Sequence, residues 1–322
     1  MDGSPRALTP LSLVLDRIAA VAPLARTETV PLDRAAGRVL AEALRASTAL
    51  PPRPLARRSG IAVRAEETLG AGPYAPVPLS LAAPVQAGAA LPAGADAVLA
   101  REAVEAMAGI VAATVPAAPG DGAVLAGGEA AEGALLVPCG SVLGPPQIAA
   151  AAWLGREALT VRAEPVVSIR LDGPAGAMLR AAVGDRPGAA DLLVLPAGGE
   201  PRLAARPIED AELAELDGVL VLRLPGGPAA WLGWLALGAA LIRRLTGRPE
   251  PEPVPARLGT RIASAVGMTD LVLARLRGET AEPLASPDAP TLAALAAADG
   301  MVMIPPESEG LPAGASVAVQ RF

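Results

Sequence analysis

Histidine, lysine and asparagine are absent from this 322-residue sequence, and every basic side chain is an arginine. Without histidine or lysine the chain cannot build a Ser-His-Asp triad, a Cys-His pair, a Schiff base, an imidazole metal site or a P-loop lysine. A single cysteine, Cys139, excludes an internal disulfide and any multi-cysteine zinc or iron–sulfur site. The remaining chemistry must use Asp, Glu, Ser, Thr, Arg or backbone amides.

Aromatic residues make up only 2% of the chain, so its cores must be packed with Leu, Val, Ile and Ala. The net charge of −6 argues against a nucleic-acid binder, which would present a basic face. The longest apolar run, "AAWLGWLALGAALI" (229–242), is shorter than the roughly 20 residues of a membrane span. We therefore read it as a buried helix and expect no membrane partner. The N-terminus shows no apolar signal segment, and with a single cysteine this favours a cytoplasmic setting.

The first third of the chain changes character twice. "LTPLSLVLDRIAAVAP" (8–23) carries apolar residues at helical spacing, and a second helix is expected from about Asp33. From Pro51 the pattern becomes short β-like runs separated by Gly and Pro, which indicates a small β-domain. "GPPQIAAAAWLGREALTV" (144–161) then returns to helix, expected to pack beside the first two helices.

Strands and helices alternate from residue 165. "PVVSIRL" (165–171), "DLLVLPAGG" (191–199) and "DGVLVLRLPGGP" (217–228) read as strands of a parallel sheet, with helices after the first and the last. The Pro-rich "RPEPEPVPA" (248–256) reads as a linker, and short alternating runs follow it to the C-terminus.

Seven segments of this chain, taken in order, carry one family pattern. "GAALPAGADAVLARE" (88–102) is the most specific of them. The others are "LDRAAGRVLAE" (32–42), "LPPRPL" (50–55), "GIAVRA" (60–65), "GALLVPCGSVLGPPQIAAAAWLG" (133–155), "LPGGP" (224–228) and "AADGMVMIPP" (297–306). Over nearly its whole length the chain resembles the molybdopterin molybdenumtransferases, the MoeA type related to the C-terminal part of gephyrin.

The resemblance implies a multidomain α/β architecture. It implies a mixed N-terminal domain at 1–50 and 141–165 with a small β-domain inserted at 51–140. A shortened three-layer α/β molybdopterin-binding-like domain is expected at 166–247, and a C-terminal β-barrel at 248–322. The family binds molybdopterin in its adenylated form, inserts molybdate and forms homodimers.

Four positions at which the family carries an acidic residue are neutral here. Where the family reads P-P-F-D-R-S-A-M-D-G-Y-A-V, this chain reads "PPRPLARRSGIAV". The family's acidic residue therefore aligns with Ser59, and its glycine aligns with Gly60. The family's R-R-R-G-E-D-I and S-T-G-D-E-L place further acids at Ala130, Pro174 and Ala175, whereas Gly173 matches. A hydroxyl or methyl group cannot replace a carboxylate that would hold a hard cation.

The loops that would meet the pterin keep mainly their glycines and prolines. Gly198 and Gly199 could bring backbone amides near a ligand, and "LPGGP" retains Pro225, Gly226 and Pro228. With Gly60 and Gly173, these are the candidate cofactor-binding residues. The family's P-G-K-P loop for molybdate cannot exist in that form, because the chain has no lysine.

Five further residues have two readings each. Arg57 and Arg58 read either as contacts for an anion or as solvated surface residues. Glu200 reads either as a ligand contact or as a residue with no part in binding. Asp96 reads as a turn residue rather than a functional acid. Cys139 reads as a small buried residue rather than a nucleophile.

The leading hypothesis is a MoeA-like protein that binds molybdopterin or the finished molybdenum cofactor without inserting molybdate. A homodimer is expected, and an active enzyme of the same pathway is the candidate partner. A non-catalytic interaction scaffold on the same fold is one alternative. A transferase with a rearranged site using Asp172, Asp185 or Glu200 is the other. No resident metal is expected, and a role for magnesium is doubtful.

Overall fold

The computed structural model describes residues 7–107, 109–184 and 188–322. The chain divides into two compact units. The inserted unit is Thr29–Thr160, and the terminal unit combines Met1–Glu28 with Val161–Phe322. Each unit is described by itself, and the finer division into four domains stays a prediction.

A four-stranded sheet forms one half of the terminal unit. Its strands are β14 (Val167–Ile169), β15 (Leu192–Pro196), β18 (Val219–Leu224) and β17 (Glu212–Leu216), in that spatial order. The first three are parallel, as the sequence pattern predicted, and β17 is antiparallel to β18. Their apolar residues are buried because helices cover the sheet.

The helices of this unit pack with the sheet in one core. They are α1 (Leu11–Ala19), α3 (Gly173–Val183), α4 (Ala229–Gly233), the π-helical turn η4 (Trp234–Gly238), α5 (Ala239–Thr246) and α6 (Leu292–Ala297). The helix predicted at 229–242 is thus present within the continuous run α4–η4–α5, which ends at Gly247 in the left-handed conformation. Leu179 of α3, Leu222 of β18 and Leu241 of α5 belong to the same buried cluster.

A closed five-stranded barrel forms the C-terminal part, in agreement with the predicted fold class. The strands β21 (Thr269–Arg277), β22 (Thr280–Pro283), β19 (Val254–Leu258), β25 (Ser316–Arg321) and β23 (Gly300–Ile304) pair in that order, and β23 returns to β21. Val272, Val302 and Val319 lie in one buried cluster, while Leu271 and Met301 join the core of the α/β part. Successive side chains of a strand point to opposite faces of the sheet. The strands β21 and β23 therefore contribute residues both to the barrel core and to the core of the α/β part.

Two short elements extend the barrel sheet, and another pair lies beside it. β1 (Thr9–Pro10) pairs in parallel with β16 (Leu203–Arg206), which pairs in parallel with β21. β20 (Ile262–Ala263) pairs with β24 (Gly310–Leu311).

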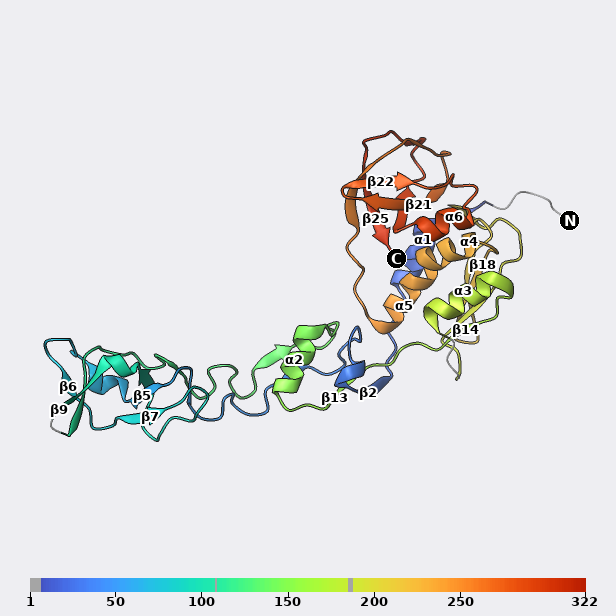
Figure 1. Ribbon diagram of the computed structural model, residues 1–322. Helices are drawn as coiled ribbons and strands as arrows, with labels where there is room; N and C mark the ends of the chain where they lie inside the picture. The colour runs from blue at the N-terminus through green and yellow to red at the C-terminus, as the bar shows by residue number, and fades with distance from the viewer. Residues whose placement is uncertain (1–6, 108, 185–187) are drawn as a thin grey trace. The chain divides into compact units, whose positions relative to one another are not determined.

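The first helix packs differently from the sequence-based expectation. Leu11, Val14 and Ile18 are buried at helical spacing, but they join the core of the terminal unit, and α1 lies beside α5 (Figure 1). The prediction of a second helix from about Asp33 was wrong, because only a 3-10 turn, η1 (Leu32–Arg34), forms there. An apolar stripe predicts that a helix is buried, but it does not identify the surface that buries it.

The inserted unit consists mainly of short strands. The sheets are β7-β5-β8 (Ala83–Val85, Gly60–Val63, Ala97–Leu99) and β6-β10-β9 (Val77–Pro78, Ile110–Ala113, Val104–Met107). The two-stranded pairs are β4–β11 (Leu55–Ala56, Ala123–Val124), β3–β12 (Leu44–Arg45, Leu135–Val137) and β2–β13 (Thr27–Pro31, Ala158–Arg162). The remaining elements are η2 (Ala65–Thr68), η3 (Arg101–Ala103) and α2 (Pro145–Trp153), whose Pro145 fills the first helical position.

Candidate functional site

A cavity of about 330 Å³ lies where the three parallel strands of the four-stranded sheet end. It is lined by the residues that follow β14, β15 and β18, by the first turn of α3 and by one residue before β17: Leu171, Asp172, Pro174, Ala175, Pro196, Ala197, Asp210, Leu224, Pro225, Gly226 and Gly227. In open α/β sheets the carboxyl ends of the strands are the usual place for a ligand. We therefore treat it as the candidate site.

Two glycines shape the turn from β14 into α3 at this cavity. Gly173 has a φ of +68°, a conformation that other residues adopt at a cost. A Cβ on Gly176 would lie 1.8 Å from the carbonyl oxygen of Leu171, so only glycine allows the helix this close to the strand end. The Arg180 guanidinium closes the turn, because its Nη1 donates to the carbonyls of Leu171 at 3.0 Å and Ile169 at 3.3 Å.

The cavity brings together part of the site expected from the resemblance. Pro174 and Ala175, where the family carries acids, both line it, and Ala175 is buried. Pro225 and Gly226 of "LPGGP" line it on the β18 side. Asp172, the N-cap residue of α3, lies beside them.

Other expected residues do not line the cavity. Gly198 and Gly199 are exposed in the loop after β15, and Pro228 is the N-cap residue of α4. The Glu200 side chain is 81% exposed, and its carboxylate lies 3.6 Å from Arg202. Asp185 lies outside the described residues.

Three expected positions belong to the inserted unit. Ser59 is exposed, and its Oγ accepts a hydrogen bond from the Ala87 amide at 3.1 Å. Gly60 begins β5, and a Cβ there would lie 2.1 Å from the carbonyl oxygen of Leu99, so this glycine is required by sheet packing. Ala130 is 8% exposed and forms an isolated bridge with Leu50.

The residues with two readings now have defined positions. Arg57 is exposed, whereas Arg58 donates to the carbonyl of Val98 through Nε at 3.1 Å and Nη2 at 2.7 Å. The side chain of Asp96 links two distant segments, since its Oδ1 accepts from the Ala65 amide at 2.7 Å, and its turn role stays a prediction. The expectation that Cys139 is buried was wrong. It is exposed beyond the end of β12, and its thiol donates to the carbonyl of Ala41 at 3.1 Å.

Asp210 lines the cavity although sequence reasoning did not select it. It lies in the turn between β16 and β17, which belong to different sheets. No local motif marks this residue, because the tertiary fold alone carries the turn to the ends of the parallel strands.

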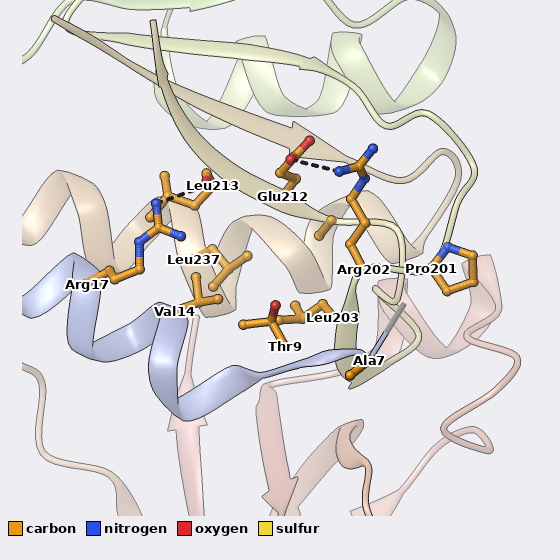
Figure 2. A pocket seen from close by; sticks show the side chains of 11 residues that line it. Ala7, Thr9, Val14, Arg17, Pro201, Arg202, Leu203, Glu212, Leu213 and Leu237 are labelled. Carbon is orange, nitrogen blue, oxygen red and sulfur yellow. Dashed lines mark hydrogen bonds and ion pairs between the residues drawn. The ribbon is translucent and has the colours of Figure 1, made fainter. Parts of the chain in front are cut away.

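A second cavity, of about 270 Å³, lies between α1, β1 and the residues around β16 and β17 (Figure 2). Its charged groups are already paired within the protein. Arg202 contacts Glu212 at 3.2 Å, and Arg17 donates to the carbonyl of Leu213 at 3.4 Å. The lining contains none of the residues expected from the resemblance, so we do not treat it as the functional site.

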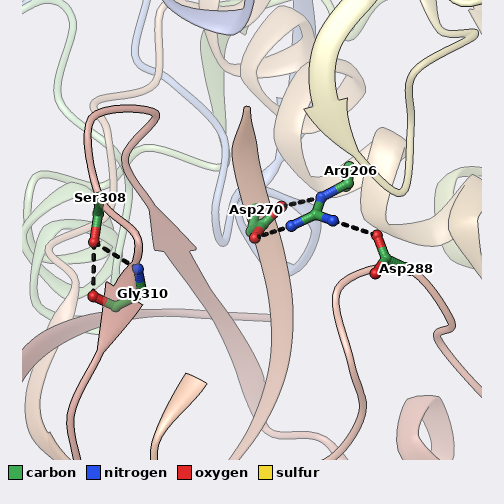
Figure 3. Close-up of polar contacts among 5 residues, drawn as sticks. All are labelled: Arg206, Asp270, Asp288, Ser308 and Gly310. Atoms are coloured by element: carbon green, nitrogen blue, oxygen red, sulfur yellow. Dashed lines mark hydrogen bonds and ion pairs between the residues drawn. The ribbon is translucent and has the colours of Figure 1, made fainter. Parts of the chain in front are cut away.

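Buried charge in the terminal unit also has a structural use. Arg206 of β16 binds both carboxylate oxygens of Asp270, through Nε at 2.7 Å and Nη2 at 2.6 Å, and Nη1 contacts Asp288 at 2.6 Å (Figure 3). The hydrogen bonds that Arg206 donates to Asp270, with a smaller effect of Asp288, raise the pKa of Arg206 above the ordinary arginine value. Figure 3 also shows the turn in which Ser308 Oγ accepts from the Gly310 amide at 3.0 Å.

The fold is that of a multidomain α/β protein with a cavity at the end of a mainly parallel sheet. Residues 9–155 match the family model of the MoeA N-terminal region (domains I and II), and residues 255–322 match that of the MoeA C-terminal region (domain IV). The two matches together span about two thirds of the chain. The chain belongs to the MoeA family, and the segment between the matches contains the four-stranded sheet and its cavity.

Solved structures show the same fold. A molybdopterin biosynthesis MoeA protein from Pyrococcus horikoshii is 24% identical with a TM-score of 0.82, and the match covers 98% of this chain and 99% of that one. A second structure of such a protein, from Pyrococcus horikoshii OT3, gives 22% identity, a TM-score of 0.79 and coverage of 98% and 100%. A molybdenum cofactor biosynthesis protein from Pyrococcus furiosus is 19% identical with a TM-score of 0.63, and the match covers 98% of this chain and 100% of that one. A search of curated protein sequences gives no match.

Among the helices that the structure describes, none combines the length and hydropathy needed to cross a bilayer.

Proposed function

We propose that this protein acts in molybdenum-cofactor biosynthesis or handling by binding molybdopterin or the finished cofactor, without inserting molybdate. Membership of the MoeA family supports the ligand, since the structural relatives from Pyrococcus are described as molybdopterin and molybdenum-cofactor biosynthesis proteins. The single observation that carries the proposal is the cavity at the end of the parallel strands, lined by Pro174 and Ala175 where the family has acids.

The binding half of the proposal follows from the shape and lining of the cavity. Its volume of about 330 Å³ lies within the range of small-molecule sites, roughly 300–1,000 Å³. Leu171, Leu224 and Pro225 supply apolar walls, and Gly226 and Gly227 leave the backbone of the loop after β18 accessible. Such a site can hold a flat ring against apolar side chains.

The proposed lack of insertion rests on the groups that stand at the family's acidic positions. A neutral hydroxyl at Ser59, methyl groups at Ala130 and Ala175 and a ring at Pro174 supply no anionic oxygen for a divalent cation. The chain also contains no lysine that could hold molybdate. Each lost electrostatic contact can lower a rate by about 10² or more.

Two measurements on the full chain test the two halves separately. Isothermal titration with molybdopterin and with its adenylated form should show binding, and no binding at millimolar ligand would disprove the first half. Molybdenum incorporation into adenylated molybdopterin, with magnesium present, should be absent beside an active family member as positive control. Turnover comparable with that control would instead support a transferase with a rearranged site.

Ser59→Asp tests whether one carboxylate restores insertion. We expect no rescue, because Ala130, Pro174 and Ala175 still lack charge and residues that act as a unit do not compensate singly. The variant should fold, since Ser59 is exposed and such substitutions change stability by about 0.5 kcal/mol or less.

A further inference from the structure

A third cavity, of about 390 Å³, opens at the other end of the four-stranded sheet from the candidate site. It lies beside the last turn of α3 and one side of α5, and Val167, the first residue of β14, is part of its wall. Its volume is within the range of small-molecule sites. Among the described residues that line it, none is a position expected from the family resemblance. The cavity is therefore independent of the proposed function.

Apolar side chains form one side of this cavity. Val183 of α3, Ile242 of α5 and Trp234 line it. Trp234 begins the π-helical turn η4, and a Cβ on Gly238 would lie 2.2 Å from the indole ring. The ring is thus packed against the backbone at Gly238 and fixed in place. Single π-helical turns inside α-helices are frequent at functional sites, and this one holds a large apolar ring at a cavity wall.

The charged residues that line the cavity are Arg243, Arg248 and Glu164. Arg248 Nη2 lies 3.1 Å from the Glu164 carboxylate, so these two charges balance. Arg243 Nη2 lies 2.8 Å from Glu250, which is 66% exposed and is not part of the lining. Arg243 Nε is buried and has no hydrogen-bond partner in the part of the chain that the structure describes. A buried N–H without an acceptor is unfavourable, and an acceptor on a ligand would satisfy it.

Other charged groups near the cavity are engaged within the protein. Arg244, next to Arg243 on α5, donates through Nη2 to a backbone carbonyl that follows α1. Asp191 is bound by Arg26 and by the backbone amide that precedes β14. Arg162 also has an interaction of its own. Among the described residues, the lining carries two positive charges and one negative charge, so it favours an anionic group.

The end of α5 does not need the Arg243 guanidinium as a cap. The carbonyl of Arg243 accepts from the Arg248 amide at 2.9 Å, and the carbonyl of Arg244 accepts from the Gly247 amide at 3.1 Å. The Thr246 hydroxyl donates to the carbonyl one turn earlier at 2.8 Å. Capping of the helix therefore leaves the Nε–H of Arg243 available to a ligand.

We infer that this cavity binds a small carboxylate with an apolar body. The carboxylate accepts the hydrogen bond from Arg243 Nε, because guanidinium and carboxylate groups form strong charge-assisted hydrogen bonds. The hydrocarbon part lies against Val183, Ile242 and Trp234, where burial removes apolar surface from water. The site is a second one, at the amino ends of the parallel strands.

Isothermal titration of the full chain with octanoate provides the main test. Octanamide, which has the same chain and a neutral head group, is the matched ligand control. We expect octanoate to bind and octanamide to bind at least about tenfold more weakly, because an amide forms no charge-assisted hydrogen bond with a guanidinium. Inorganic phosphate should not compete with octanoate, because it has no apolar part.

The variants R243Q and R244Q test the head-group contact. Both remove one positive charge from the last turn of α5, but only Arg243 lines this cavity. R243Q should weaken octanoate binding about tenfold or more, and R244Q should change it much less. If R243Q fails to fold by circular dichroism, R243K replaces it. That variant keeps the charge but has no Nε donor at this position, and it should also weaken binding.

The variants A182L and A181L locate the ligand. Both alanines are exposed on α3, but only Ala182 lines the cavity, so the added side chain narrows it in A182L alone. A182L should weaken octanoate binding, and A181L should leave it unchanged. Absence of octanoate binding at millimolar concentration, equal binding of octanamide, competition by phosphate, equal effects of R243Q and R244Q, or unchanged binding in A182L would each overturn the inference. None of these results bears on the proposed function, because the two cavities lie at opposite ends of the sheet.

Discussion

Asp270 is fully buried, and both of its carboxylate oxygens bind the Arg206 guanidinium. Asp288 contacts the same guanidinium, but its side chain is 62% exposed. We expect D270A to lower the free energy of unfolding by about 3–5 kcal/mol, because it leaves a largely buried cation without its main partner. D288A, the matched control, should cost less than about 1 kcal/mol. Urea denaturation followed by tryptophan fluorescence measures both, since Trp231 and Trp234 lie in the same unit. Equal losses would contradict the prediction.

Glu67 in the inserted unit gives a pH-dependent prediction. Hydrogen bonds from the side chain and amide of Ser80 lower the pKa of Glu67 below its ordinary 4.5 in the folded protein, and the Leu81 amide and Arg64 add smaller effects. A pKa that is lower in the folded than in the unfolded state stabilises the fold above the unfolded pKa. That stabilisation is lost as the pH falls through the lower, folded pKa.

The variant E67Q should therefore be less stable than the wild type at neutral pH. The difference should shrink as the pH falls below the ordinary glutamate pKa of 4.5 and disappear in stronger acid. E66Q is the control, because Glu66 is exposed and lies 3.8 Å from Arg64. Thermal denaturation followed by circular dichroism between neutral and acid pH measures this, and a constant difference between E67Q and wild type would refute the assignment.

At the scale of elements, the contact between α3 and β14 should depend on Gly176. Glycine to alanine inside a helix ordinarily stabilises by up to about 1 kcal/mol. Here the added Cβ would lie 1.8 Å from the Leu171 carbonyl oxygen, so we expect G176A to destabilise by about 1–3 kcal/mol. G198A is the control, because a Cβ at Gly198 meets no atom within 4 Å and should change stability by about 0.5 kcal/mol or less. Chemical denaturation of both variants decides this, and a stabilised G176A would show that the helix can move away without cost.

Elements with strong local patterns could be predicted, and elements set by their surroundings could not. The apolar runs of β14, β15 and β18 and the capped helix α4–η4–α5 follow from composition and periodicity. The segment after Asp33 carried helical residues but formed only η1, because short-range propensity is easily overridden by pairing and packing. Cys139 lies two residues beyond the buried Val137 yet is exposed. The strand β12 ends at Val137, and the chain becomes exposed within the next two residues. The apolar residues before Cys139 did not indicate where the strand would end.

At the scale of the whole molecule, we predict a homodimer in solution. The family resemblance motivates it, and the exposed apolar surface of the inserted unit is consistent with it, since Trp153 at the end of α2 is 78% exposed. Light scattering at micromolar concentration should give twice the 32.0 kDa of the monomer. A mass near the monomer value would contradict the prediction.

The sequence by itself determined the MoeA resemblance, the order of α/β and barrel segments and the lack of histidine and lysine chemistry. These features are local in the chain, so composition, periodicity and motif order are enough to read them. The tertiary structure alone decided that α1 packs beside α5 and that Asp210 meets Asp172, Pro174 and Pro225 around one cavity. Such neighbours are far apart along the chain, and their contact depends on the free energy of packing the whole core rather than on any short stretch of residues.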